Sequence, residues 1–94
     1  MSDIIAKAVE ALSAKVSSFD GSAKFVIENE GSIILDNDGV RAGDDDTDVT
    51  LTASAETFEG MMNGDVNPTM AFMQGKLKID GSMSDAMKLA SVLA

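Results

Sequence analysis

The sequence predicts a single α+β domain over residues 1–94, with a layer of helices on a mostly antiparallel sheet. Apolar residues recur at helical spacing near both ends of the chain, and they alternate with polar residues in the middle. The strands therefore have one apolar and one polar face, which is typical of an antiparallel sheet covered on one side only.

The first expected element is an amphipathic helix that ends near residues 17–21. Ser2 is its expected N-cap, because a serine hydroxyl can accept a bond from the first free backbone N–H groups. Its polar residues fall between the members of one apolar stripe. The stripe consists of Ile4, Ile5, Ala8, Val9, Leu12 and Val16.

A run of strands is expected next. The stretch from Ala23 to Glu28 alternates with period two, and turn signals at 30–31 and 37–39 place strands at 32–36 and from residue 40. The acidic residues 44–46 predict a solvated loop. The stretch "DVTLTA", residues 48–53, alternates again and predicts a further strand.

The last third of the chain predicts three helices and one strand. Ser54 caps a short helix closed by Gly64, and the Asn67-Pro68 pair begins a second helix that ends near residue 74. Residues 76–80 alternate as a strand, and Ser82 or Ser84 caps the final helix. The expected apolar stripe of that helix consists of Met83, Ala86, Met87, Ala90 and Leu93.

The composition argues against several classes of function. The chain has no histidine and no cysteine, so the usual proton shuttle, thiolate nucleophile and common zinc sites are absent, and we expect no enzyme and no cofactor. The net charge of −9 argues against nucleic acid as a partner. No run of apolar residues is long enough to span a bilayer and no secretory signal is present, which predicts a soluble cytoplasmic protein.

The acidic cluster at residues 44–48 does not fit a calcium loop. An EF-hand needs a glycine at its sixth position and a glutamate at its twelfth. Neither the frame that begins at Asp36 nor the frame that begins at Asp44 supplies them. We therefore expect a solvated loop and no metal site.

Methionines concentrate in one part of the sequence. Six of the seven lie between Met61 and Met87, spread over three expected helices. Methionine is flexible and polarizable, so it fills irregular space and adapts to varied apolar partners. Opposite a sheet face of Ile, Val and Leu, this composition suits a deformable apolar cavity, although an ordinary core remains the alternative.

Three lysines lie in an otherwise weakly charged region. Lys76 and Lys78 alternate with the apolar residues of the last strand, and Lys88 lies on the last helix. These residues are either a solvated surface or a cationic rim for an anionic head group. Alternation points the two strand lysines away from the apolar face, so they could line an entrance but not an interior.

The stretch "NPTMAFMQGKLKIDGSMSDAMKL", residues 67–89, resembles the C-terminal signature of the sterol carrier protein type 2 family. In that family a helix that begins with Asn-Pro leads to Gly-Lys-Leu-Lys, and a glycine turn and a helix with Met-Lys-Leu follow. The matching positions are Asn67, Pro68, Phe72, Gly75, Lys76, Leu77, Lys78, Gly81, Met83, Met87, Lys88 and Leu89. The upstream stretch "ETFEGMMNG", residues 56–64, matches a short helix of the family, and the specific match covers residues 48–89.

The resemblance implies a five-stranded sheet with helices on one face and an apolar tunnel between the layers. It also implies a stand-alone carrier that binds fatty acids, acyl-CoA, sterols or similar lipids with loose selectivity, and that touches membranes transiently. The alternative is a non-catalytic protein-interaction or accessory module, which would use the Met-rich face to hold a partner or to help an enzyme handle an apolar substrate. The oligomeric state stays open. The expected ligand-binding residues are Phe58, Met61, Met62, Met70, Phe72, Met73, Leu77, Ile79, Met83 and Met87.

Overall fold

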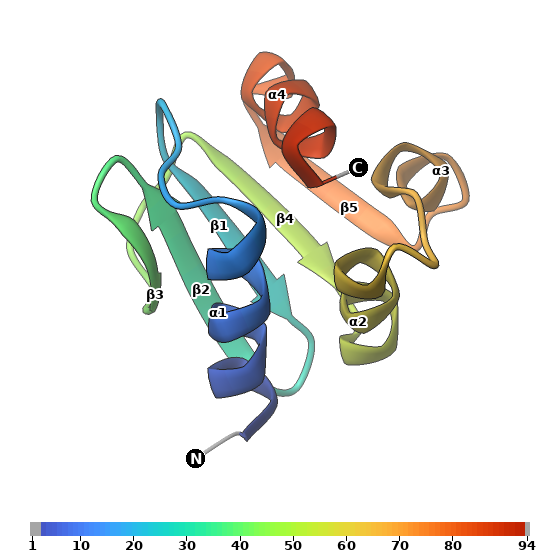
Figure 1. The fold of residues 1–94 in the computed structure, drawn as a ribbon. Helices are drawn as coiled ribbons and strands as arrows, with labels where there is room; N and C mark the ends of the chain where they lie inside the picture. Colours follow the sequence, from blue (N-terminus) through green and yellow to red (C-terminus); the bar gives the residue numbers. More distant parts are fainter. Residues whose placement is uncertain (1–2, 94) are drawn as a thin grey trace.

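The computed structural model describes residues 3–93, which form four helices and five strands (Figure 1). Ser2, the expected first N-cap, lies outside the described residues. None of the helices within residues 3–93 has the length and apolar character needed to cross a membrane. In chain order the elements are α1 (Asp3–Lys15), β1 (Ala23–Ile27), β2 (Gly31–Asp36), β3 (Gly39–Ala42), β4 (Val49–Ala53), α2 (Ala55–Asn63), α3 (Pro68–Met73), β5 (Leu77–Gly81) and α4 (Met83–Leu93).

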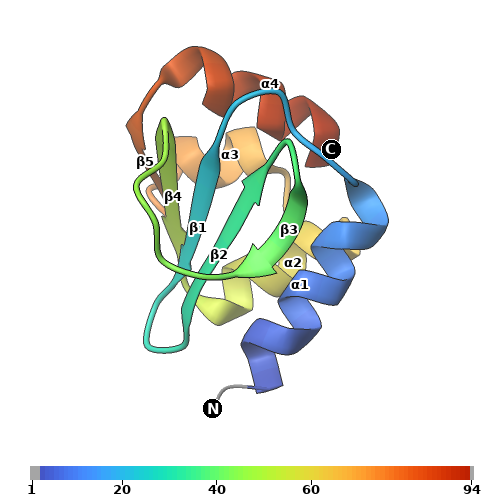
Figure 2. The ribbon, with the colours of Figure 1, turned by 90° about the vertical axis from the view of Figure 1, so that its left-hand side faces the viewer.

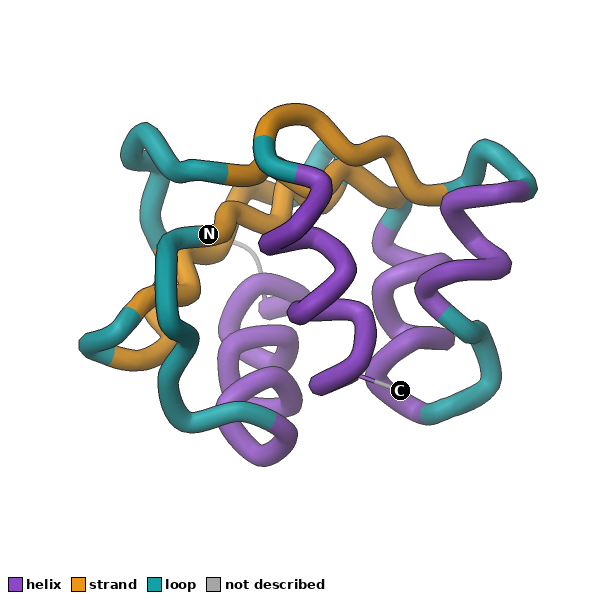
Figure 3. The backbone as a smooth tube through the Cα atoms, turned by 90° about the horizontal axis from the view of Figure 1, so that it is seen from above, coloured by secondary structure: helices purple, strands orange, loops and turns teal. Residues whose placement is uncertain are grey.

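The strands form one sheet in the order β3-β2-β1-β4-β5. Three neighbouring pairs are antiparallel, and the central pair of β1 and β4 is parallel. The sheet is therefore mixed, and the prediction of a mostly antiparallel five-stranded sheet is confirmed. All four helices lie on the same face of the sheet, which gives the two expected layers (Figures 1 and 3).

A row of apolar side chains crosses the helix-facing side of the sheet. Strand register places Phe25 beside Ile33 on one side and beside Leu51 on the other, and Leu51 pairs with Ile79. The ring of Phe25 also meets the ring of Phe58 from α2 edge-on, with centroids 5.6 Å apart and an interplanar angle of 69°. This row forms the base on which the helices pack.

Residues 43–48 connect β3 to β4 by crossing the far face of the sheet (Figure 2). The Ser32 hydroxyl donates to the Gly43 carbonyl at 2.6 Å, and the Lys24 ammonium lies 2.8 Å from the Asp44 carboxylate. The acidic side chains of this segment are exposed, as a solvated loop predicts, but its backbone covers Ile34, which is 1% exposed. The far face is therefore covered over β2, which the sequence interpretation missed.

The side chains with shifted pKa values lie on β1, β2 and β3, and their partners lie in the β2–β3 hairpin or in the crossing segment. The backbone N–H of Asp38 and the Arg41 guanidinium hold the pKa of the Asp36 carboxyl below its usual value. The hydrogen bond to Asp44 raises the pKa of Lys24. These groups lie on β1–β3 and the crossing segment, away from α3 and α4.

The helix caps follow the sequence. The Ser54 hydroxyl accepts from the backbone N–H of Thr57 at 3.1 Å, and Gly64 ends α2 with a left-handed φ of 84°. The Asn67 side chain accepts two backbone N–H bonds at the start of α3, where Pro68 needs no donor of its own. The hydroxyl of Ser82, one of the two expected candidates, accepts from the N–H of Asp85 at the start of α4.

Substitution by alanine should destabilise the protein more at Gly81 than at Gly75, although both glycines have a positive φ. The φ of Gly81 is 105°, and a Cβ there would collide with the backbone carbonyl of Asp48. Gly81→Ala should lower the free energy of unfolding by at least about 2 kcal/mol through strain and displacement of β4. Gly75 has a φ of 77° and open space around the same position, so Gly75→Ala should lose only about 1 kcal/mol.

Urea unfolding followed by circular dichroism measures both losses. Equal losses for the two variants would contradict the close approach of β5 to residue 48.

Candidate functional site

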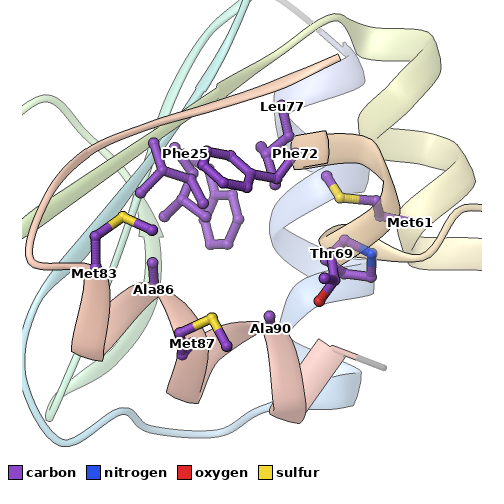
Figure 4. A pocket seen from close by; sticks show the side chains of 12 residues that line it. Phe25, Met61, Thr69, Phe72, Leu77, Met83, Ala86, Met87 and Ala90 are labelled. Carbon is purple, nitrogen blue, oxygen red and sulfur yellow. The ribbon is translucent and has the colours of Figure 1, made fainter. Parts of the chain in front are cut away.

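An apolar cavity of about 50 Å³ lies between the sheet and the helices α2, α3 and α4 (Figure 4). Both layers contribute to its wall. The sheet supplies Phe25, Leu51, Leu77 and Ile79. The helices supply Met61, Pro68, Thr69, Phe72, Met83, Ala86, Met87 and Ala90.

The cavity has a buried floor and an exposed rim. Phe25, Leu51 and Met61 are at most 3% exposed. Strand pairing places Phe25 beside Leu51, and the ring of Phe25 packs edge-on against Phe58. By contrast, Phe72 is 41% and Met87 is 59% exposed, and they border the cavity from α3 and α4 (Figure 4). The cavity can therefore widen on the rim side more easily than on the floor side.

The sequence of α4 explains its contribution to the site. Met83 and Met87 lie four residues apart and so project from one side of the helix, and Ala86 and Ala90 form a neighbouring pair with the same spacing. The alanines fill little of the space between helix and sheet. Leu89, which is fully buried, holds α4 against the sheet beside them.

Among the residues that the structure describes, no titratable side chain lines the cavity, and Thr69 is the polar side chain in its wall. The groups with shifted pKa values, Lys24, Asp36 and Arg41, all lie elsewhere. Among the described residues, no buried side-chain nitrogen or oxygen lacks a hydrogen-bond partner. The lining can therefore hold an apolar group by burial.

The structure gathers six of the ten expected site residues around this cavity. These six are Met61, Phe72, Leu77, Ile79, Met83 and Met87. Phe58 lies behind the wall, against Phe25, and Met62 lines a separate hollow between α1 and α2. Met70 and Met73 do not line the cavity and are 50% and 73% exposed.

Six lining residues were not expected from the sequence. Phe25 and Leu51 lie on strands in which apolar and polar residues alternate, so the sequence predicts that they point into the core. It does not predict that they lie beside the methionines of the helices. The small residues of α4 lack the size that drew attention to the methionines. The residues missed are Phe25, Leu51, Pro68, Thr69, Ala86 and Ala90.

The cavity is small for a lipid in this conformation. A water molecule needs about 10–15 Å³ of such space, so 50 Å³ holds only a few water-sized groups. A long alkyl chain needs more room than that. Binding of such a chain therefore requires Phe72, Met83 and Met87 to turn outward or α4 to shift.

A family model described as the SCP-2 sterol transfer family matches residues 2–94. Hydroxysteroid dehydrogenase-like protein 2 of Bos taurus is 38% identical to the chain over 95 residues, which cover 99% of the chain and 22% of that protein. The human protein of the same name is 36% identical over 95 residues, which again cover 99% of the chain and 22% of that protein. The chain thus spans about a fifth of the length of these curated relatives.

Solved structures with the same fold are known. Sterol Carrier Protein 2 from Yarrowia lipolytica, in its apo form, aligns with a TM-score of 0.69 and 28% identity, over 95% of this chain and 75% of that one. The palmitated SCP2L2 from Aedes aegypti aligns with a TM-score of 0.68 and 25% identity, over 99% and 95% of the two chains. These matches confirm the resemblance inferred from residues 48–89, and the chain belongs to the SCP-2 sterol transfer family.

Proposed function

We propose that the chain is a non-catalytic lipid carrier that works in the cytoplasm. The cavity between the sheet and the helices α3 and α4 takes the apolar part of a fatty acid, acyl-CoA, sterol or similar lipid. The proposal rests on one observation, which is an apolar floor behind a rim of exposed methionines and Phe72. The palmitated relative from Aedes aegypti supports a fatty acyl chain as one ligand.

Burial of an alkyl chain supplies enough free energy without a polar anchor. A chain of about fifteen CH₂ groups gains roughly 12 kcal/mol in gross terms, at about 0.8 kcal/mol each. Association costs at least about 4 kcal/mol. The remainder, about −8 kcal/mol, corresponds to a dissociation constant near micromolar.

The lining also bears on selectivity. Because no charged side chain reaches the cavity, the head group of a bound lipid stays at the opening, in contact with water. An apolar wall distinguishes ligands mainly by shape and size, and a rim of flexible methionines weakens even that discrimination. We therefore expect several lipids to bind with similar affinities.

A second candidate function is that of an accessory module. The curated relatives carry the name of a dehydrogenase-like protein, and the chain corresponds to 22% of the bovine one. In this role the domain would hold an apolar substrate for a separate catalytic domain. The cavity would serve both functions, and the accessory role differs in requiring an enzyme as partner.

Native mass spectrometry of the protein purified from cells tests the carrier proposal directly. We expect a fraction of the molecules to retain extra mass in the lipid range, and solvent extraction should identify that mass as fatty acids or related lipids. The same fraction should disappear after delipidation and return when palmitate is added. A protein that never retains lipid and takes up none would contradict the carrier function.

Filling the cavity should weaken binding without unfolding the protein. Ala90 lines the cavity and is only partly buried, whereas the next residue, Ser91, is exposed on the same helix. Ala90→Phe should weaken binding of a fluorescent fatty acid at least about tenfold, since the ring takes the place of several CH₂ groups. Ser91→Phe, the matched control, should bind as the wild type does. Equal affinities for all three proteins would place the ligand outside this cavity.

A further inference from the structure

The large apolar side chains that the structure exposes gather on α3 and α4. Among the described residues, those recorded as exposed are Met70, Phe72, Met73, Met83 and Met87, with exposed fractions between 41% and 73%. We call these five residues the α3–α4 patch. No residue of α1 is among them, although that helix also lies on the outside of the molecule (Figure 1).

The cavity accounts for only part of the patch. Phe72, Met83 and Met87 belong to the rim, and their exposure follows from their place at the opening. Met70 and Met73 line no part of the cavity, yet Met73 is the most exposed of the five. The apolar surface therefore extends from the opening onto the outer side of α3, which ligand binding alone does not explain.

Charged residues are also distributed unevenly between the patch and the far face of the sheet. The two helices that carry the patch have little charge, because α3 has no charged residue and α4 has one acidic and one basic residue, Asp85 and Lys88. The segment 44–48, which contains four aspartates, lies on the far face of the sheet, on the side away from α3 and α4 (Figure 2). The protein can thus approach a phosphate-bearing surface with least repulsion when the patch faces that surface.

We propose that the α3–α4 patch docks on the surface of a phospholipid bilayer, with the opening of the cavity turned toward the lipid. The inference rests on the proposed lipid-binding function, because it concerns the route by which ligand reaches and leaves the same cavity. Met70 and Met73 enter the boundary between head groups and acyl chains, and a ligand passes between bilayer and cavity across the rim without crossing bulk water.

The chemistry of the patch fits lipid better than a folded protein. Hot spots of protein interfaces are enriched in tryptophan, tyrosine and arginine. The chain has no tryptophan or tyrosine, and its one arginine, Arg41, lies on β3. Unbranched methionines adapt to a surface without fixed shape, and the continuity of the patch with the opening serves transfer of a lipid.

The test compares a patch variant with a matched control. The double variant Met70→Gln/Met73→Gln removes apolar side chains that do not line the cavity and leaves the charge unchanged. The control, Ala6→Gln/Ala14→Gln, introduces the same side chains at two exposed positions of α1. Circular dichroism checks that both fold, and binding of a fluorescent fatty acid should match the wild type in both.

Two measurements use vesicles of phosphatidylcholine, without and with added phosphatidylglycerol. Cosedimentation measures partitioning onto the vesicles, and fluorescence measures the rate at which the fatty acid leaves the protein as vesicle concentration rises. The patch variant should lose at least about tenfold in partitioning, with a matching loss in the transfer rate, because two methionines no longer enter the lipid. The control should behave as the wild type.

The proposal is overturned if the patch variant and the wild type have the same partitioning and the same transfer rates. The patch would then fit a protein partner instead. Failure of the proposed function looks different. In that case the wild type does not bind the fatty acid at all. Partitioning onto vesicles can still be measured for the wild type, the patch variant and the control, so the docking surface is tested separately.

Discussion

The parallel pairing of β1 with β4 is the constraint on which the site depends. It places Phe25 beside Leu51, so the floor of the cavity is built from residues that are 26 positions apart in the sequence. It also requires residues 43–48 to return across the far face of the sheet, because a parallel strand cannot follow from a tight turn. The hydrogen bond from Ser32 to Gly43 and the ion pair of Lys24 with Asp44 hold that return path. All later elements then lie on the β4 side of the sheet, where the cavity forms.

The site combines two kinds of wall with different mechanical properties. The floor is fixed by strand register and by the edge-on contact of Phe25 with Phe58. The rim consists of long side chains on α3 and α4, of which Met87 is 59% exposed and free to change rotamer. Since the cavity is about 50 Å³, a lipid of the proposed kind would need additional space, and the rim is where that space can open. Under the proposed function, a fixed floor and a deformable rim would let one apolar pocket accept ligands of different size.

Local signals in the sequence predict most of the fold. Caps at Ser54 and at Asn67-Pro68, together with the alternation in residues 48–53, placed α2, α3 and β4 because each is decided within a few residues. The parallel pair and the burial of Ile34 were missed, since both depend on contacts between distant segments. The site was only partly predictable for a related reason. α3 is six residues long, and so short a helix does not show which of its apolar residues point inward, so Met70 and Met73 were expected in a cavity that they do not line.

The claim that a lipid lies between a fixed floor and a methionine rim can be tested with one spectrum. The methyl groups of the methionines, labelled with ¹³C, report separately on the floor at Met61, the rim at Met83 and Met87, and the outer surface at Met70 and Met73. On addition of palmitate, the account predicts large shifts and contacts with the chain at Met61, Met83 and Met87, and small changes at Met70 and Met73. Contacts confined to the outer methionines or to Met62, with Met61 unchanged, would contradict the account.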